Sequence, residues 1–254
     1  MDEETYVYDG KNYSKKEMQD LVKISIQSLK SNESPRFRET LKMLEGEKIL
    51  DVGCASGSVS QYIGQLGYKV HGIDVLENSI KIAEEFFNHK NVTYEIRDLI
   101  KNPFPENSFD CILFLETIEH VENPAQFFKE FFRILKPNGC IILSTPNATS
   151  MKNMLYALSY RKQKKRELII NEIVTEQKQT GTHLEHIYNW DFPVLVRLLD
   201  MCGFKTVDHK FTGGGPINIS IFGKKIQLIK RDSNIFKNFE PLMTTHVIKA
   251  RKKN

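Results

Sequence analysis

The central part of the chain alternates between short apolar runs and amphipathic stretches. Runs rich in Ile, Val, Leu and Phe predict strands at 48–53, 69–75, 91–98, 109–116 and 139–146. Helical spacing of apolar residues between these runs predicts helices at 57–66, 77–89 and 124–136. Strands joined by helices in this order are typical of a parallel sheet with helices on both faces. The pattern therefore predicts an α/β fold.

The two ends of the chain depart from this alternation. Residues 1–45 follow a helical pattern, with a capping box at Ser14 and Glu17, and are predicted to form an N-terminal helical cap before a domain at 46–254. The segment 148–182 is rich in Lys, Gln and Glu and is predicted to be an inserted helical lid. The remaining predictions are a helix at 191–202 and strands near 204–211 and at 245–252.

Composition narrows the class of protein. A chain of 254 residues with 40% hydrophobic residues can build one large α/β domain. No apolar run approaches the roughly 20 residues of a membrane helix, and the acidic start "MDEE" lacks the basic residues of a secretory signal. We therefore expect a cytoplasmic protein. The cysteines lie far apart and are expected to be free thiols; they are Cys54, Cys111, Cys140 and Cys202.

Charge is distributed unevenly along the chain. Residues 1–150 carry 17 basic and 23 acidic side chains, whereas residues 151–254 carry 19 basic and 9 acidic ones. The basic excess is compatible with an anionic partner such as RNA. A solvated helix face followed by a charged tail explains the same residues, so the pattern leaves both interpretations open.

The stretch "DVGCASG" at 51–57 follows the first strand of the alternating region, where open parallel sheets bind ligands. The dinucleotide fingerprint would need glycine at 53, 55 and 58, but the chain has Gly53, Ala55 and Ser58. No Gly-Lys-Ser/Thr follows, which also excludes a phosphate-binding P-loop. Asp51 would repel a pyrophosphate and favour a ligand with a cationic end.

Two further acids end the next two predicted strands. Asp74 stands where the carboxylate of dinucleotide folds binds ribose hydroxyls, and Asp98 can accept a hydrogen bond from an adenine amino group. Together with Asp51, these residues predict a site for adenosine that carries a positively charged amino-acid tail. That ligand is S-adenosylmethionine.

Five motifs occur in a characteristic order: "ILDVGCASG", "VHGIDV", "IRDLIKNPFPENSFD", "LETIEHVENP" and "RILKPNGCIILSTPN". In this order they resemble the class I S-adenosylmethionine-dependent methyltransferases, and in particular the quinone-biosynthesis O-methyltransferases. The resemblance implies a doubly wound, seven-stranded, mostly parallel Rossmann-like sheet with an antiparallel strand near the C-terminus. The cofactor-binding residues that it implies are Asp51, Gly53, Ala55, Gly57, Asp74, Val75, Asp98, Leu99, Leu115 and Glu116. Ala55 replaces the glycine usual in the family, and we expect this small residue to be tolerated.

The expected reaction is methyl transfer to an oxygen of a small molecule. Transfer from a sulfonium is an in-line displacement, so alignment of the reactants supplies much of the acceleration. An O–H or N–H acceptor must also lose a proton to a general base. Candidates for this catalytic role are Glu119, His120, His183 and His186.

The segment "LETIEH" also allows a second hypothesis. If it is helical, Glu116 and His120 lie on one face, and with Glu119 and His183 they could hold a divalent metal. The run resembles that of the metal-dependent small-RNA 3′-terminal 2′-O-methyltransferases. The same pattern also occurs in small-molecule methyltransferases without metal, so we expect no metal. A non-catalytic partner protein that binds S-adenosylmethionine is the third hypothesis.

Overall fold

The computed structural model describes residues 5–8, 11–31, 34–151, 153–154, 186–213, 217–221, 224–229 and 240–253. The predicted lid at 148–182 therefore lies mostly outside the described residues, as do the basic run 161–166 and His183. The helices are α1 (Lys15–Lys30), α2 (Pro35–Met43), α3 (Ser58–Gln65), α4 (Glu77–Phe86), α5 (Pro124–Ile134) and α8 (Phe192–Met201), with short 3-10 helices η1 (Ile118–His120) and η3 (Glu240–Leu242). The strands are β1 (Thr5–Tyr8), β2 (Lys11–Ser14), β3 (Lys48–Val52), β4 (Lys69–Asp74), β5 (Val92–Ile96), β6 (Phe109–Leu115), β7 (Leu135–Pro146), β8 (Phe204–Thr212), β9 (Ile217–Ile221), β10 (Lys224–Ile229) and β11 (Thr245–Lys252).

One seven-stranded sheet organises the fold, in the order β5-β4-β3-β6-β7-β11-β8. Strands β3 to β7 pair in parallel, and β11 pairs antiparallel with both β7 and β8. This topology confirms the predicted doubly wound sheet with its antiparallel strand. Because chain order runs outward from β3 in both directions, the carboxyl ends of β3 and β6 flank the switch point where such sheets bind ligands.

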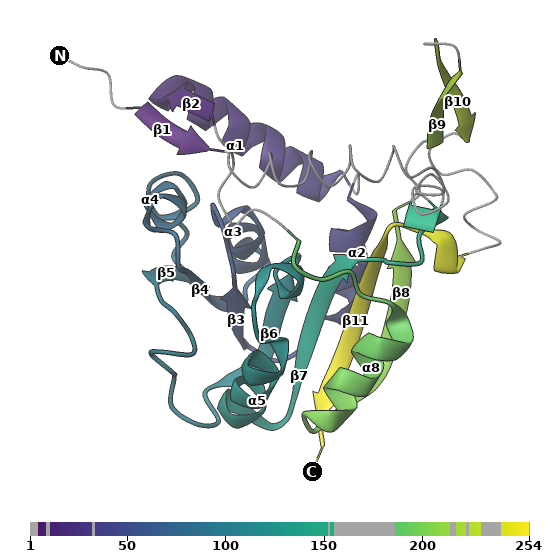
Figure 1. Ribbon diagram of the computed structural model, residues 1–254. Helices are drawn as coiled ribbons and strands as arrows, with labels where there is room; N and C mark the ends of the chain where they lie inside the picture. The colour runs from purple at the N-terminus through teal and green to yellow at the C-terminus, as the bar shows by residue number, and fades with distance from the viewer. Residues whose placement is uncertain are drawn as a thin grey trace.

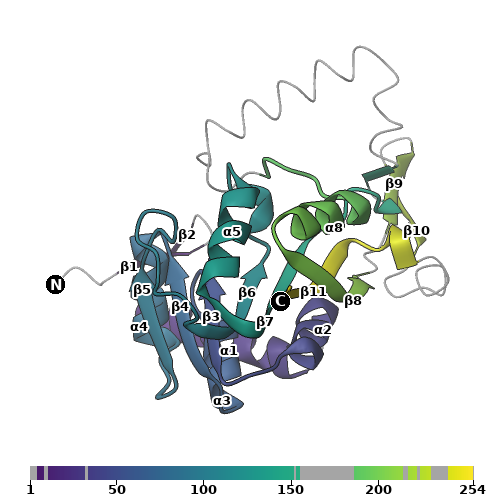
Figure 2. The ribbon, with the colours of Figure 1, turned by 90° about the horizontal axis from the view of Figure 1, so that it is seen from below.

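Helices cover both faces of the sheet, as Figures 1 and 2 show. On one face, Phe128 and Phe131 of α5 and Leu195 and Leu199 of α8 pack on the sheet. On the other, α2 and α3 cover it. Strands buried on both faces need apolar residues at successive positions, which explains the unbroken apolar runs in the sequence. None of the helices in the described ranges has the length and apolar character of a membrane span.

The N-terminal region was predicted to be helical, but it also contains two strands. A two-stranded antiparallel hairpin of β1 and β2 precedes α1, and the capping box at Ser14 then starts that helix. Tyr6 of the hairpin is buried and packs with Met18 of α1 and Ile82 of α4. An isolated hairpin of two short strands is at best marginally stable, so this one gains its stability from packing on the helices. The sequence of two four-residue strands does not predict such packing.

Candidate active site

The turn between β3 and α3 lies at the carboxyl edge of the sheet. Backbone N–H groups of Gly53 and Cys54 donate to the Ile73 carbonyl of β4 at 2.9 and 3.0 Å, which ties the turn to the neighbouring strand. Gly53 and Gly57 have φ of 75° and 84°, in the left-handed region that favours glycine. Ala55 adopts φ 47°, at a cost of about 1 kcal/mol. Its replacement by glycine would remove this strain.

Side chains occupy the space that the two glycines leave open. A Cβ at Gly53 would lie 2.6 Å from Thr117 Oγ1, and one at Gly57 would lie 2.6 Å from Tyr94 Oη. The Tyr94 hydroxyl donates toward the carbonyls of Gly57 and Phe87, at 3.0 and 2.8 Å. Sequence reasoning missed Tyr94, because nothing in the strand "VTYEI" shows that its ring supports the turn.

The predicted acids stand at the ends of three adjacent strands. Asp74 at the end of β4 accepts from the backbone N–H of Ala55 and of Leu76, both at 2.9 Å, and so joins the turn to α4. Asp98 follows β5, accepts from the Ile100 N–H at 3.0 Å and pairs with Lys101 Nζ at 3.1 Å. Both carboxylates are half-buried and face the same edge, where each oxygen can still accept a further hydrogen bond.

Asp51 occupies a different environment from the other two acids. Its side chain is 3% exposed, and its Oδ2 accepts from Ser60 Oγ of α3 at 2.5 Å. Burial raises the pKa of Asp51 to about 6, since desolvation outweighs the hydrogen bond from Ser60. A carboxylate kept charged in such surroundings gains most from a cation placed beside it.

The raised pKa predicts a stability change that depends on pH. Well below pH 4 Asp51 is protonated in both folded and unfolded chains, and well above pH 6 the folded protein bears the full cost of the buried charge. Asp51→Asn should therefore raise the free energy of unfolding by about 2–3 kcal/mol at pH 7.5 and leave it nearly unchanged near about pH 3. Urea unfolding at both pH values measures this difference.

Asp98→Asn is the matched control for that experiment. The pKa of Asp98 lies below its usual value, because the hydrogen bonds from Lys101 and Ile100 outweigh the effect of burial. Its substitution should destabilise the protein at pH 7.5, opposite in sign to the change at Asp51. Equal effects of both substitutions would show that Asp51 carries no desolvation cost.

The other residues predicted to bind S-adenosylmethionine lie near the same edge, and their side chains differ in how exposed they are. Val75 after β4 is 62% exposed, whereas Leu99 is 2% exposed and belongs to the core under the sheet edge. Leu115 ends β6, and its carbonyl accepts from Thr117 Oγ1 at 3.0 Å. Thr117 in turn fills the space over Gly53, so the end of β6 lies directly against the glycine turn.

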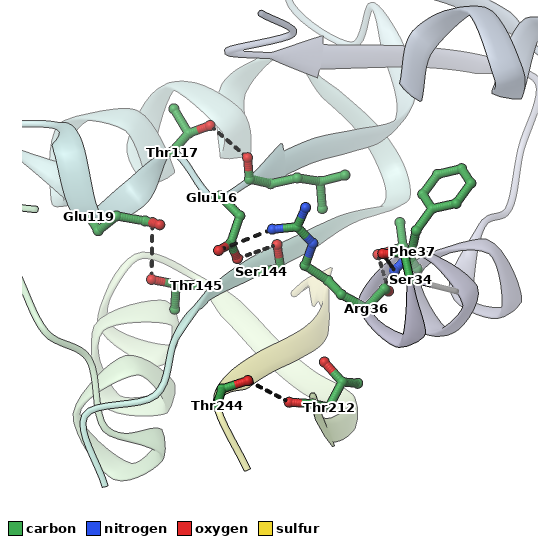
Figure 3. A network of polar contacts seen from close by, with 12 residues as sticks. Ser34, Arg36, Phe37, Glu116, Thr117, Glu119, Ser144, Thr145, Thr212 and Thr244 are labelled. Carbon is green, nitrogen blue, oxygen red and sulfur yellow. Dashed lines mark hydrogen bonds and ion pairs between the residues drawn. The ribbon is translucent and has the colours of Figure 1, made fainter. Parts of the chain in front are cut away.

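The segment after β6 is not an α-helix, which corrects one premise of the metal hypothesis. Glu116 has φ 50°, and only Ile118–His120 form a 3-10 turn. Consequently Glu116 and Glu119 make different contacts, as Figure 3 shows. Glu116 accepts from Ser144 Oγ at 2.9 Å and pairs with Arg36, whereas Glu119 accepts from Thr145 Oγ1 at 3.0 Å.

Glu119 meets two of the predicted histidines. Its backbone carbonyl accepts from the N–H groups of Ile187 and Tyr188 at 2.7 and 3.2 Å, which holds segment 186–190 over η1. This places the rings of His120 and His186 4.9 Å apart. One ligand atom from each of Glu119, His120 and His186 lies within 4.8 Å of the other two.

The electrostatics of this group suit proton transfer or metal binding. The Glu119 side chain is fully buried, and its Oε1 has no hydrogen-bond partner among the described residues. Burial, and then the negative charge of Glu116, raise the pKa of Glu119 to about 7. Burial and the neighbouring His120 lower the pKa of His186, which favours its neutral form. Glu116, which the metal hypothesis also named as a ligand, does not belong to this group of three.

Comparison with known proteins agrees with the predicted class of protein. Residues 50–143 match the family model described as a methyltransferase domain. The chain is 38% identical over 112 residues to the mitochondrial ubiquinone biosynthesis O-methyltransferase of Arabidopsis thaliana, covering 42% of this chain and 35% of that protein. It is 33% identical over 137 residues to the phosphoethanolamine N-methyltransferase of Plasmodium falciparum, covering 52% of each.

A solved structure shares the fold of this chain beyond the matched residues. A SAM-dependent methyltransferase of Methanosarcina mazei superposes with a TM-score of 0.58 at 24% identity, over 84% of this chain and 96% of the other. The family match, the similar relatives and the shared fold support the class I S-adenosylmethionine-dependent methyltransferases that the motifs indicated. It spans between about a third and a half of the length of the two curated relatives described above.

Proposed function

We propose that the protein transfers a methyl group from S-adenosylmethionine to an oxygen of a small-molecule acceptor. The bound donor supplies an electrophilic methyl group on a sulfonium, and the protein must align an acceptor with it. Asp74 would bind the ribose hydroxyls, Asp98 with Val75 and Leu99 would contact the adenine, and Asp51 would attract the ammonium group. Leu115 and Glu116, at the end of β6, would lie beside the methyl group.

The arrangement of Glu119 with His120 and His186 is the observation that supports this proposal best. An acceptor hydroxyl becomes a better nucleophile when a nearby base removes its proton, and a pKa near 7 is well matched to that task. Glu119 lies three residues after Glu116, so the base and the donor share one edge of the sheet. The names of the relatives include both O- and N-methyltransferases, which is compatible with such a base.

Labelled methyl groups test the proposal directly. The protein is incubated with a cell extract and isotopically labelled S-adenosylmethionine, and the extract is then separated into small molecules, RNA and protein. We expect label in the small-molecule fraction. Label confined to RNA or protein would contradict the acceptor class. Donor binding without label in any fraction would identify a non-catalytic donor-binding protein instead.

A metal-assisted reaction is the second candidate, because the three ligand atoms already lie together. Glu119, His120 and His186 offer one oxygen and two nitrogen ligands, and Glu119 Oε1 has no partner among the described residues. Such a set suits divalent ions such as Mn²⁺, Co²⁺ or Zn²⁺. The ion would hold the acceptor oxygen and favour its deprotonated form, with an RNA ribose as one such acceptor.

Metal removal separates the two candidates. If Glu119 acts as the proton acceptor, activity should survive dialysis against EDTA within about twofold, because proton transfer then needs only the protein's own groups. Activity is measured before dialysis, after dialysis and after addition of Mn²⁺, Co²⁺ or Zn²⁺. A loss of activity that one of these ions restores would reject the metal-free proposal and establish the second candidate.

A further inference from the structure

Two histidines form a hydrogen-bonded pair on strands β8 and β11. His209 Nε2 and His246 Nδ1 lie 3.2 Å apart, and the side chain of His246 is fully buried. Phe192, at the start of α8, stacks on the His209 ring with centroids 3.9 Å apart. The Phe211 ring lies 4.4 and 5.1 Å from the two imidazole centroids. Apolar side chains would fill such an aromatic cluster at a lower desolvation cost, so packing alone does not explain the pair.

The pair faces the same side of the sheet as Glu119. His246 is paired in register with Thr145 of β7, and the side chains of residues paired in this way share a face. The Thr145 hydroxyl donates to the Glu119 carboxylate, as Figure 3 shows. The imidazole pair therefore begins one strand beyond the residue that holds Glu119.

Segment 186–190 connects the candidate base to the histidine pair. Near its start, two of its N–H groups donate to the Glu119 carbonyl. At its end, Trp190 is buried, and its carbonyl accepts from a backbone N–H just after β7 at 2.9 Å. Phe192 follows two residues later and is the ring that stacks on His209. The segment is thus held by η1 on one side and leads directly onto the histidine pair on the other.

Both imidazoles are neutral near pH 7. Burial, and for His209 also the neighbouring His246, lowers the pKa of each ring to about 4. Among the described residues, the charged side chains that act on the pair are Lys210 and Asp208 on β8 and Asp191 before α8, and the two aspartates oppose burial only in part. Because each pKa lies below its usual value of 6.5, the packing on the pair is fully stable well above that pH and weakens as the pH falls toward 4.

We infer that His246, supported by His209, is a positioning residue that holds segment 186–190, and with it His186, over Glu119 for methyl transfer. The inference rests on the proposed function, because it assigns the segment to the acceptor side of that reaction. It applies whether His186 acts in proton transfer or in metal binding. Most of the proposed donor-binding residues lie at the ends of β3, β4 and β5, away from β8 and β11 in the sheet. The pair should therefore affect methyl transfer and not donor binding.

Trp190 is the only tryptophan of the chain, so its fluorescence reports directly on this segment. At pH 7.5, His246→Ala should shift the emission to longer wavelength and increase its quenching by acrylamide, because the segment loses its support. Transfer of labelled methyl groups to the small-molecule fraction should fall about 10- to 100-fold, while donor affinity measured by calorimetry stays within about twofold. His246→Asn, whose amide can replace Nδ1 in the hydrogen bond to His209, should restore most of the wild-type rate and emission.

Acid titration supplies a readout that a general loss of stability would not reproduce. In the wild-type protein the Trp190 emission should change at a higher pH than the far-UV circular dichroism, since protonation of the pair loosens the segment before the sheet unfolds. The double variant with His209→Gln and His246→Asn should lose this early change, because amides do not titrate.

His71→Asn is the matched control, because His71 is a half-buried histidine of the same sheet whose ring nitrogens contact Thr93 and Glu95 of β5. It should preserve the Trp190 emission and keep the transfer rate within about twofold. Either an unchanged Trp190 signal or an unchanged rate in a folded His246→Ala protein would overturn the inference, as would equal losses of donor binding and transfer. A wild-type protein that transfers no methyl group would overturn the proposed function, and the Trp190 measurements would still decide whether the pair holds the segment.

Discussion

Asp74→Ala is expected to weaken binding of S-adenosylmethionine at least about 100-fold. The carboxylate would accept hydrogen bonds from two ribose hydroxyls, and hydrogen bonds to a charged group contribute about 1.5–3 kcal/mol each. The same carboxylate also accepts from the N–H groups of Ala55 and Leu76, so its loss releases the glycine turn. Isothermal titration calorimetry with the donor and with S-adenosylhomocysteine measures the change.

Glu77→Ala provides the matched control for Asp74. Glu77 lies three residues further on, exposed in the first turn of α4. Its substitution should leave donor affinity within about twofold. Asp74→Asn keeps an oxygen that can cap one of the two N–H groups and should bind more tightly than Asp74→Ala. Unchanged donor affinity in a folded Asp74→Ala protein would refute the ribose assignment.

Glu119→Gln is expected to lower kcat about 10²- to 10⁴-fold, the usual range for loss of a general base, without changing donor affinity. In the wild-type protein, activity should rise with pH to a plateau with a midpoint near 7, because Glu119 accepts a proton only when ionised. The glutamine variant should lose this rise. A pH profile of kcat under saturating donor measures both effects.

Glu122→Gln is the control for this substitution, since Glu122 is exposed and only its backbone carbonyl contacts Tyr188. It should keep both the rate and the pH profile of the wild-type protein. A Glu119→Gln enzyme that retains the rate and the rise near pH 7 would exclude Glu119 as the base and leave His120 and His186 as the remaining described candidates.

Much of the fold could be predicted because its signals are local. The alternation of buried strands and amphipathic helices gave β3 to β6 within two residues at each end, and the last strand matches Thr245–Lys252. Strand β7 begins at Leu135, four residues before its predicted start, and therefore includes Lys136, Pro137 and Asn138. These residues resemble a turn in the sequence, and they interrupt the regular pairing of β6 with β7, which resumes at Cys140. Asn138 has φ 63°, as in a turn.

The acids of the candidate site were found because each lies at or near the end of a strand, and adjacent parallel strands end at one edge. Other features of the site depend on contacts between distant parts of the chain. His186 meets His120 because hydrogen bonds hold segment 186–190 against η1, those to the Glu119 carbonyl among them, and Tyr94 supports the turn from another strand. Arg36 gave no signal in the sequence, since an arginine near a helix start is ordinary. Periodicity and spacing carry no information about such contacts.

The roles assigned to Asp51, Asp74 and Asp98 all depend on one claim, which is that the carboxyl edge around the glycine turn binds S-adenosylmethionine. Calorimetric titration of the wild-type protein with S-adenosylmethionine, S-adenosylhomocysteine and NAD tests that claim most directly. We expect one site for each of the two sulfur compounds and no binding of NAD, because the turn lacks the dinucleotide spacing and carries a buried acid. Absence of binding by both sulfur compounds, or equally tight binding of NAD, would contradict it.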